Sequence, residues 1–130
     1  MRFLFLISTL LAVALNASHI SWYGNFDKAH QASIKENKKL MVLLIKKDCK
    51  PCQYSIKTTF LNQPYIKDIN DNYISVIVTK NQKESYPIEM LYTFEYPTLF
   101  FLDNRELFVC NPIRGKIAPD KLKSYLKQCN

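Results

Sequence analysis

The chain has 130 residues, 48% of them hydrophobic and 22% charged, a composition typical of one globular domain rather than a disordered chain or a multidomain enzyme. Only two glycines are present, which excludes the glycine-rich loops that hold phosphates in nucleotide-dependent enzymes. The net charge of +7 comes from scattered lysines without an arginine-rich block, which favours a solvated basic surface over a nucleic-acid interface.

The N-terminus has the pattern of an export signal. Arg2 precedes an apolar run over residues 3–15, which is short for a bilayer-spanning helix, and the small residue Ala17 suits cleavage. We expect a signal peptide over residues 1–17 and a single domain over residues 18–130, with an uncleaved anchor as the alternative. Since disulfides persist outside the cytoplasm, we interpret the four cysteines in an oxidising compartment such as the bacterial periplasm.

The first elements after this segment are predicted from capping and hydrophobicity. A helix is predicted over Phe26 to Glu36, with Asn25 as its N-cap and Asp27 in its first turn. Six consecutive apolar residues, Leu40 to Ile45, indicate a strand covered on both faces. A second helix is predicted over Gln53 to Phe60.

The remaining chain alternates between strands and helices. The predicted elements are a strand over Tyr73 to Thr79, a short helix over Ile88 to Tyr92, strands over Thr98 to Leu102 and Leu107 to Cys110 joined by a turn at Asp103 to Glu106, and a helix over Asp120 to Gln128 that Pro119 begins. The aromatic side chains in or beside these strands are expected in the core, namely Tyr73, Phe94, Phe100, Phe101 and Phe108. This order predicts an α/β domain with a mixed central sheet flanked by helices.

The motif Cys49-Lys50-Pro51-Cys52 falls at a predicted strand-to-helix junction. Unpaired backbone N–H groups and the positive end of the helix dipole would stabilise a Cys49 thiolate there, Lys50 would add to this effect, and Asp48 would oppose it. Pro51 fits a first helical turn. Cys52, one turn further along, is expected to be the more buried thiol and to resolve a mixed disulfide. We therefore expect Cys49 and Cys52 to be catalytic, and Asp48, Lys50 and Pro51 to tune the thiolate.

A metal site is the alternative interpretation of this motif. A structural zinc site needs four ligands, and the other cysteines and the two histidines, His19 and His30, lack the required spacing. Thiolates also suit Cu(I), but neither Met nor His lies in the motif to complete such a site. We expect no metal and no organic cofactor, and a non-catalytic module that binds a metal or a protein stays open.

The other two cysteines, Cys110 and Cys129, are predicted to lie close together. The chain would leave Cys110 as a strand of about five residues, with a rise of about 3.3 Å per residue. It would return to Cys129 as a helix of about ten residues, with a rise of about 1.5 Å per residue, so the two paths would have nearly the same length. We expect a structural disulfide between them, which would close a loop of about twenty residues. The alternative is a buried Cys110 and a free Cys129.

The order and spacing of these features resemble the thioredoxin superfamily from about Trp22 to Lys127. The shared features are the buried strand, Cys49-Lys50-Pro51-Cys52, Tyr96-Pro97-Thr98 before a further strand, a hairpin, Gly115 and a final amphipathic helix. The segment from Trp22 to Leu40 is most similar to exported thioredoxin-like domains such as the C-terminal domain of DsbD. The resemblance implies a thioredoxin fold.

The resemblance also implies roles for single residues. Cys49 would be the nucleophile, Cys52 the resolving cysteine, and Pro97 a cis-proline whose loop lies against both. Tyr96, Pro97 and Thr98 would bind the extended chain of a client, with the Tyr96 backbone offered to it.

Three positions differ from the family pattern. Leu43 stands where many thioredoxins carry a buried acid that takes the proton of the resolving thiol, so Cys52 would need water or another group for that step. Asp48 replaces a tryptophan that often precedes the first cysteine, and Tyr96 is bulkier than the usual residue before the cis-proline. These differences predict a narrower activity than that of a general cytoplasmic reductase.

We therefore expect an exported thiol:disulfide oxidoreductase that acts in the periplasm as a protein-disulfide reductase or electron relay. Its expected partners are client proteins that contain disulfides and a membrane electron donor of the DsbD type, with no nucleic acid and a monomeric state. A disulfide oxidase that uses the same pair is the alternative enzyme, because Cys-Lys-Pro-Cys does not encode a direction.

Overall fold

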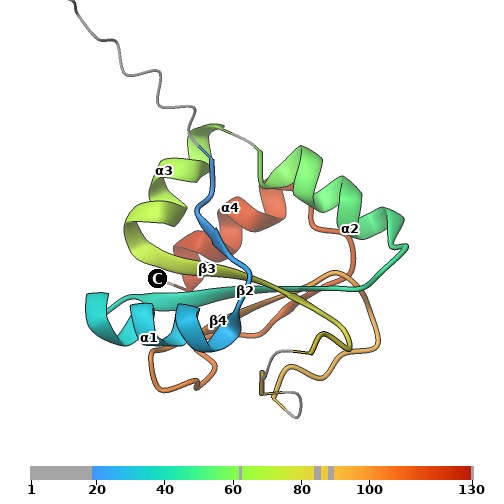
Figure 1. The fold of residues 1–130 in the computed structure, drawn as a ribbon. Helices are drawn as coiled ribbons and strands as arrows, with labels where there is room; N and C mark the ends of the chain where they lie inside the picture. The colour runs from blue at the N-terminus through green and yellow to red at the C-terminus, as the bar shows by residue number, and fades with distance from the viewer. Residues whose placement is uncertain (1–18, 62, 84–85, 88–89, 130) are drawn as a thin grey trace, which may run out of the picture.

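The computed structural model describes residues 19–61, 63–83, 86–87 and 90–129, so the expected signal peptide over residues 1–17 lies outside the described residues (Figure 1). The elements in chain order are β1 (Trp22–Tyr23), α1 (Phe26–Glu36), β2 (Lys39–Ile45), α2 (Lys50–Tyr54), a π-helical segment η1 (Ser55–Thr59), α3 (Gln63–Asn72), β3 (Tyr73–Thr79), β4 (Thr98–Leu102), β5 (Ile113–Arg114) and α4 (Pro119–Gln128). None of the helices in the described ranges is both long and apolar enough to cross a bilayer.

The strands form one mixed five-stranded sheet in the order β1-β3-β2-β4-β5. β3 pairs in parallel with both β1 and β2, whereas β4 pairs antiparallel with β2 and β5 antiparallel with β4. Ile45 at the end of β2 lies opposite Thr79 at the end of β3, and Leu44 lies opposite Thr98 at the start of β4. The ends of β2 and β3 and the start of β4 therefore meet at one edge of the sheet.

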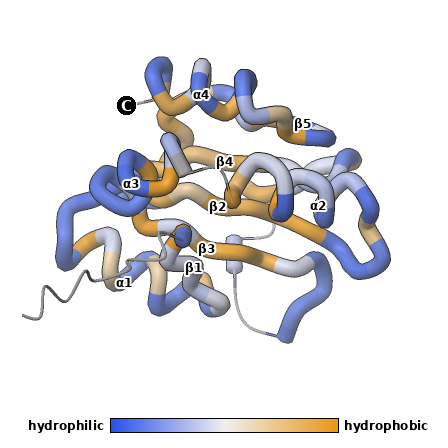
Figure 2. The backbone as a smooth tube through the Cα atoms, turned by 90° about the horizontal axis from the view of Figure 1, so that it is seen from above, coloured by the Kyte–Doolittle hydropathy of each residue, from blue (hydrophilic) through white to orange (hydrophobic). Residues whose placement is uncertain are grey.

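Helices cover both faces of this sheet. Since side chains alternate along a strand, Met41 and Leu43 of β2 pack on one face, under α3, α4 and the helical segment after the cysteines, while Leu40 and Val42 pack on the other, under α1. Viewed from above, the central strands consist largely of hydrophobic residues, whereas the helices contain many hydrophilic ones (Figure 2). The predicted α/β class, with a mixed sheet flanked by helices, is confirmed.

Most predicted elements match the structure to within a residue or two, and α1 matches at both ends. Its cap is also as predicted, because the Asn25 side chain accepts a hydrogen bond of 2.9 Å from the Lys28 backbone N–H. Asn37 ends the helix with φ 51°, a left-handed conformation that asparagine tolerates. The helix that the cysteines begin starts earlier than predicted, at Lys50, and changes to η1 at Ser55.

The helix α3 was missed by the sequence analysis, which assigned no element to residues 61–72. Pro64 lies in its first turn, where a missing N–H removes no hydrogen bond, and Ile66 and Ile69 are buried one turn apart. Conversely, the short helix predicted over Ile88 to Tyr92 lies partly outside the described residues, and Met90 and Leu91 form a turn.

The strand predicted over Leu107 to Cys110 is wrong, since only Phe108 makes a single bridge to Leu102. The returning chain pairs regularly only in β5, where Ile113 lies opposite Leu99. Two residues separate Leu99 from Leu102 in β4, whereas four separate their partners Ile113 and Phe108, so two extra residues form a bulge. Pro112 lies in this bulge, where it has no N–H to donate to a ladder.

The turn after β4 is held by Asp103. Its carboxylate accepts hydrogen bonds from the backbone N–H groups of Leu107 (3.0 Å) and Arg105 (2.8 Å), and these bonds lower the pKa of Asp103 below its usual value. Two aromatic side chains expected in the core are exposed instead, Phe108 by 48% and Phe94 by 85%. Phe108 follows this irregular turn, and Phe94 lies in the irregular loop before β4.

Candidate active site

The cysteine pair follows β2 by a short turn. Asp48 has φ 56°, in the left-handed region that aspartate tolerates better than most residues, and this conformation redirects the chain from strand to helix. Cys49 is then the N-cap of α2, with Pro51 in its first turn. Asp48, Lys50 and Pro51, which were predicted to tune the thiolate, are exposed around the pair.

Cys49 and Cys52 form a disulfide at the start of this helix. The backbone N–H of Cys52 donates a hydrogen bond of 3.1 Å to Cys49 Sγ. Such a bond stabilises negative charge on Cys49 once the pair is reduced. Cys49 and Cys52 are 4% and 2% exposed, so the expected order of burial holds by a small margin.

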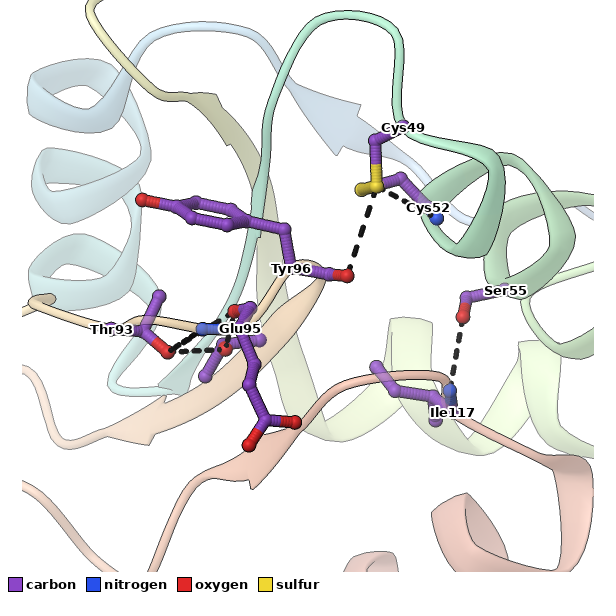
Figure 3. The surroundings of a disulfide bond; sticks show 8 residues. Cys49, Cys52, Ser55, Thr93, Glu95, Tyr96 and Ile117 are labelled. Atoms are coloured by element: carbon purple, nitrogen blue, oxygen red, sulfur yellow. Dashed lines mark hydrogen bonds between the residues drawn. A yellow bond between two sulfur atoms is a disulfide. The ribbon is translucent and has the colours of Figure 1, made fainter.

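The loop before β4 lies against the disulfide. The Tyr96–Pro97 peptide bond is cis, the isomer that the sequence favoured. The Tyr96 carbonyl oxygen lies 3.7 Å from Cys49 Sγ and is directed at it, while the Tyr96 ring points away (Figure 3). A disulfide sulfur has no proton to donate, so this approach is a contact in the oxidised state and provides an acceptor for a Cys49 thiol.

A network of hydroxyl groups holds this loop. The Thr98 hydroxyl donates to the Glu95 carbonyl at 2.6 Å and lies 2.9 Å from the Thr93 hydroxyl. Arg114 Nη1 donates to Thr93 Oγ1 at 3.0 Å. The Thr98 side chain, which was predicted to contact clients, is therefore buried support for the loop. Pro97 is also buried, and its carbonyl accepts a hydrogen bond of 2.8 Å from Gly115 N–H.

The helical segment after the cysteines is fixed to the start of α4. Ser55 Oγ accepts a hydrogen bond of 3.0 Å from the Ile117 N–H, and the Thr59 hydroxyl donates to the Ile117 carbonyl (Figure 3 shows the first). Both hydroxyl groups belong to the π-helical turn, a geometry that often occurs near functional sites. The loop that contains Gly115 and the helix that contains the cysteines are thus joined.

The structure gives the positions of Leu43 and Trp22, whose surroundings the sequence does not define. Leu43 is fully buried in the apolar core beneath α3 and α4. Trp22 packs edge-on against Phe60, with ring centroids 5.4 Å apart, so it covers the edge of that core.

A pocket of about 370 Å³ lies next to the Tyr96 ring, and the sequence analysis did not identify it. Its lining includes Lys46, Lys80, Tyr92 and Phe94. Lys46 Nζ and Lys80 Nζ lie 5.4 Å and 5.5 Å from the centroid of the Tyr96 ring. Burial, followed by the neighbouring phenols, raises the pKa of Tyr96 above its ordinary value, which keeps its hydroxyl protonated.

The other cysteines, Cys110 and Cys129, form a disulfide that joins the end of α4 to the bulge before β5.

His30, in α1, is paired with Glu106 at 3.2 Å and with the Asn104 carbonyl at 2.8 Å, so it connects α1 to the turn after β4. Across the described ranges, no three His, Cys, Asp or Glu side chains group in a way that could hold a metal ion.

Comparison with known proteins agrees with this geometry. A family model described as thioredoxin-like matches residues 21–104. The fold is similar to that of a thioredoxin from Thermus thermophilus, with 16% identity over 85% of this chain and 86% of that chain and a TM-score of 0.71.

Two further solved structures have the same fold. The oxidised C-terminal domain of DsbD from Neisseria meningitidis is 17% identical over 80% of this chain and 91% of that chain, with a TM-score of 0.62. A DsbH oxidoreductase is 18% identical over 84% of this chain and 85% of that chain, also with a TM-score of 0.62. No curated protein sequence matches the chain.

Proposed function

Since the chain belongs to the thioredoxin-like family, we propose that it is an exported protein-disulfide reductase or electron relay that works through Cys49 and Cys52. A thioredoxin-like fold with a cysteine pair at this spacing supports a thiol:disulfide oxidoreductase in general. The observation that carries the proposal is the Cys52 N–H bond of 3.1 Å to Cys49 Sγ at the start of a helix. This bond favours a Cys49 thiolate, which is the attacking species in disulfide exchange.

The proposed reaction has two exchange steps. The Cys49 thiolate attacks one sulfur of a client disulfide, which forms a mixed disulfide and releases the other client sulfur as a thiolate. Cys52 then loses its proton to solvent and attacks Cys49 Sγ, which forms the Cys49–Cys52 disulfide and releases the second client thiolate. Two electrons pass to the client, whose thiolates take up protons.

The reduced protein must then be regenerated by an outside electron donor. The proposed donor is a membrane protein of the DsbD type, which would reduce the Cys49–Cys52 disulfide by the same exchange chemistry. The signal-like N-terminus supports export to the periplasm, and the Cys110–Cys129 disulfide suits an oxidising compartment. We propose that the protein acts there as a monomer on client proteins that contain disulfides.

Cysteine variants test the proposed roles. We expect Cys49→Ser to abolish reduction of a model protein disulfide, because no thiolate remains to attack. We expect Cys52→Ser to accumulate mixed disulfides with clients, because the second exchange is blocked. Turnover is followed in an assay with a chemical reductant, and mixed disulfides are identified by mass spectrometry after the thiols are alkylated.

A Cys110→Ala, Cys129→Ala variant is the matched control, because it removes two cysteines outside the proposed active pair and should keep its turnover. Reduction at the wild-type rate by Cys49→Ser would contradict the nucleophile assignment. Failure of Cys52→Ser to trap any client would contradict the resolving role.

A further inference from the structure

The sheet topology brings two lysines together at the edge where the cysteines lie. β2 and β3 are parallel and in register up to Ile45 and Thr79, and Lys46 and Lys80 follow these residues directly. The Lys80 backbone N–H donates to the Ile45 carbonyl at 2.8 Å, which keeps the two chains adjacent beyond the strands. Both lysine ammonium groups then lie within 5.5 Å of the centroid of the Tyr96 ring.

These two charges have no anionic partner among the described residues. The ion pairs found there involve other side chains, and the described residues that line the pocket include no Asp or Glu. A ring face attracts each ammonium group only weakly at an exposed site. Two like charges around one ring also repel each other, so a carboxylate entering this pocket would relieve the repulsion and gain two charged neighbours.

Besides the lysines, the lining has two polar residues, Asn81 and Thr93, and is otherwise apolar or aromatic. Leu44 and Leu91 are buried beneath it, and the exposed rings of Tyr92 and Phe94 pack edge-on with centroids 5.1 Å apart. Phe94 is 85% and Tyr92 60% exposed, so the two rings together present an apolar surface to solvent. Tyr96 joins the pocket to the disulfide, because its carbonyl lies 3.7 Å from Cys49 Sγ.

We propose that this pocket selects clients, and that its occupant is an acidic segment of the client chain next to the client disulfide. A client Asp or Glu would lie between Lys46 and Lys80, and a neighbouring apolar side chain would pack on Tyr92 and Phe94. The inference rests on the proposed function, because the segment is positioned by the exchange at Cys49. It adds a charge preference for the substrate to that function.

Synthetic peptides test this selectivity. In each peptide, one cysteine forms a mixed disulfide with a coloured thiol, and a phenylalanine follows that cysteine. The Cys-Phe pair is flanked by Glu in one peptide and by Gln in the other. The reduced protein should release the thiol from the Glu peptide about tenfold faster than from the Gln peptide at low salt. The ratio of the Glu-peptide rate to the Gln-peptide rate should fall about threefold in Lys46→Gln or in Lys80→Gln and approach one in the double variant. For the wild-type protein, the same ratio should decrease at high salt.

Two controls separate charge recognition from other effects. Lys123→Gln removes an exposed charge from α4, across the sheet, and should keep the wild-type ratio. The neutral substrate hydroxyethyl disulfide reports any change in Cys49 reactivity. For each variant, the rate with a peptide is therefore divided by the rate with hydroxyethyl disulfide. A Glu peptide with serine in place of cysteine should bind the oxidised protein and shift the NMR signals of Lys46, Lys80 and Tyr96.

The outcomes distinguish this inference from the proposed function. Equal normalised rates for the Glu and Gln peptides, together with no binding of the serine peptide, would overturn the inference while reduction itself continued. Binding of the serine peptide without reduction of any disulfide would overturn the proposed function and support the pocket as an acidic-peptide site.

Discussion

Cys49 is subject to two opposing backbone groups. The Cys52 N–H at 3.1 Å stabilises a thiolate, whereas the Tyr96 carbonyl at 3.7 Å is an acceptor that stabilises the protonated thiol. The N–H is closer, and electrostatic interaction weakens with distance, so the thiolate is favoured. Because the carbonyl belongs to the proposed client-binding loop, any shift of that loop changes the reactivity of Cys49.

Gly115 is one of the residues that hold that loop in place. Its φ of 79° is left-handed, and its N–H donates to the Pro97 carbonyl at 2.8 Å. A Cβ at this position would also lie 2.8 Å from Glu95 Oε2, although that side chain end can move.

We expect Gly115→Ala to lower the free energy of unfolding by about 1–2 kcal/mol, the cost of a left-handed alanine, and to slow turnover through the Pro97 loop. Urea denaturation and the disulfide-reduction assay measure the two effects. Gly24→Ala is the matched control, since a Cβ there meets nothing within 4 Å, and it should change the free energy of unfolding by less than about 0.5 kcal/mol. Equal losses in the two variants would contradict this account.

Single residues were predictable from the sequence where a motif defines them. Cys49 and Cys52 were paired by their motif, and the resemblance to the thioredoxin superfamily placed the Pro97 loop against them. The structure has that loop beside the disulfide, with the Tyr96 carbonyl 3.7 Å from Cys49 Sγ. Thr98 was expected at the client surface and is buried, because its hydroxyl is used by the loop itself. The exposure of Phe94 could not be foreseen, since burial of an aromatic residue depends on contacts from distant parts of the chain.

At the scale of elements, α4 connects the two disulfides of the fold. Its N-terminal side is joined to the cysteine helix through Ile117, Ser55 and Thr59, and its C-terminal side is joined to the bulge through Cys129. The Cys110–Cys129 bond therefore fixes the far end of an element that supports the active pair. Its expected contribution is to stability and not to exchange.

Removal of this bond tests that division. The Cys110→Ala, Cys129→Ala variant frees a loop with a sequence separation of 19 residues, which predicts a loss of about 3 kcal/mol and a fall of about 10–15 °C in Tm. The redox potential of the Cys49–Cys52 pair should stay unchanged. Cys110→Ala alone is the control and should lose a similar amount, because either change breaks the bond. A wild-type Tm, or a shifted potential, would contradict this role.

Elements with a strong local signal were predictable, and those that depend on long-range pairing were not. The cap at Asn25 and the apolar run from Leu40 to Ile45 identify α1 and β2 from short segments. β5 is only two residues long and is displaced by a bulge, so no periodicity indicates it. The missed helix α3 did contain a signal, namely Pro64 followed by Ile66 and Ile69 at helical spacing.

At the scale of the molecule, the proposed active pair and the basic pocket both lie at one edge of the sheet. Two parallel strands end there, the antiparallel β4 begins there, and the cysteine helix starts just beyond β2. Lys46, Lys80 and Tyr96 are far apart in sequence and meet only because of this topology. The sequence identified the exchange chemistry, whereas the basic pocket required the fold.

The Cys49–Cys52 pair is proposed to cycle between dithiol and disulfide and to act as a reductant. The test is a redox titration of residues 18–130 against glutathione and dithiothreitol, with mass mapping of the cysteine pairing at each step. We predict reversible cycling of this pair at about −270 mV or lower, as in reducing thioredoxins. A potential of about −120 to −180 mV would contradict the reductase and indicate an oxidase or isomerase, and a pair that never cycles would contradict the oxidoreductase itself.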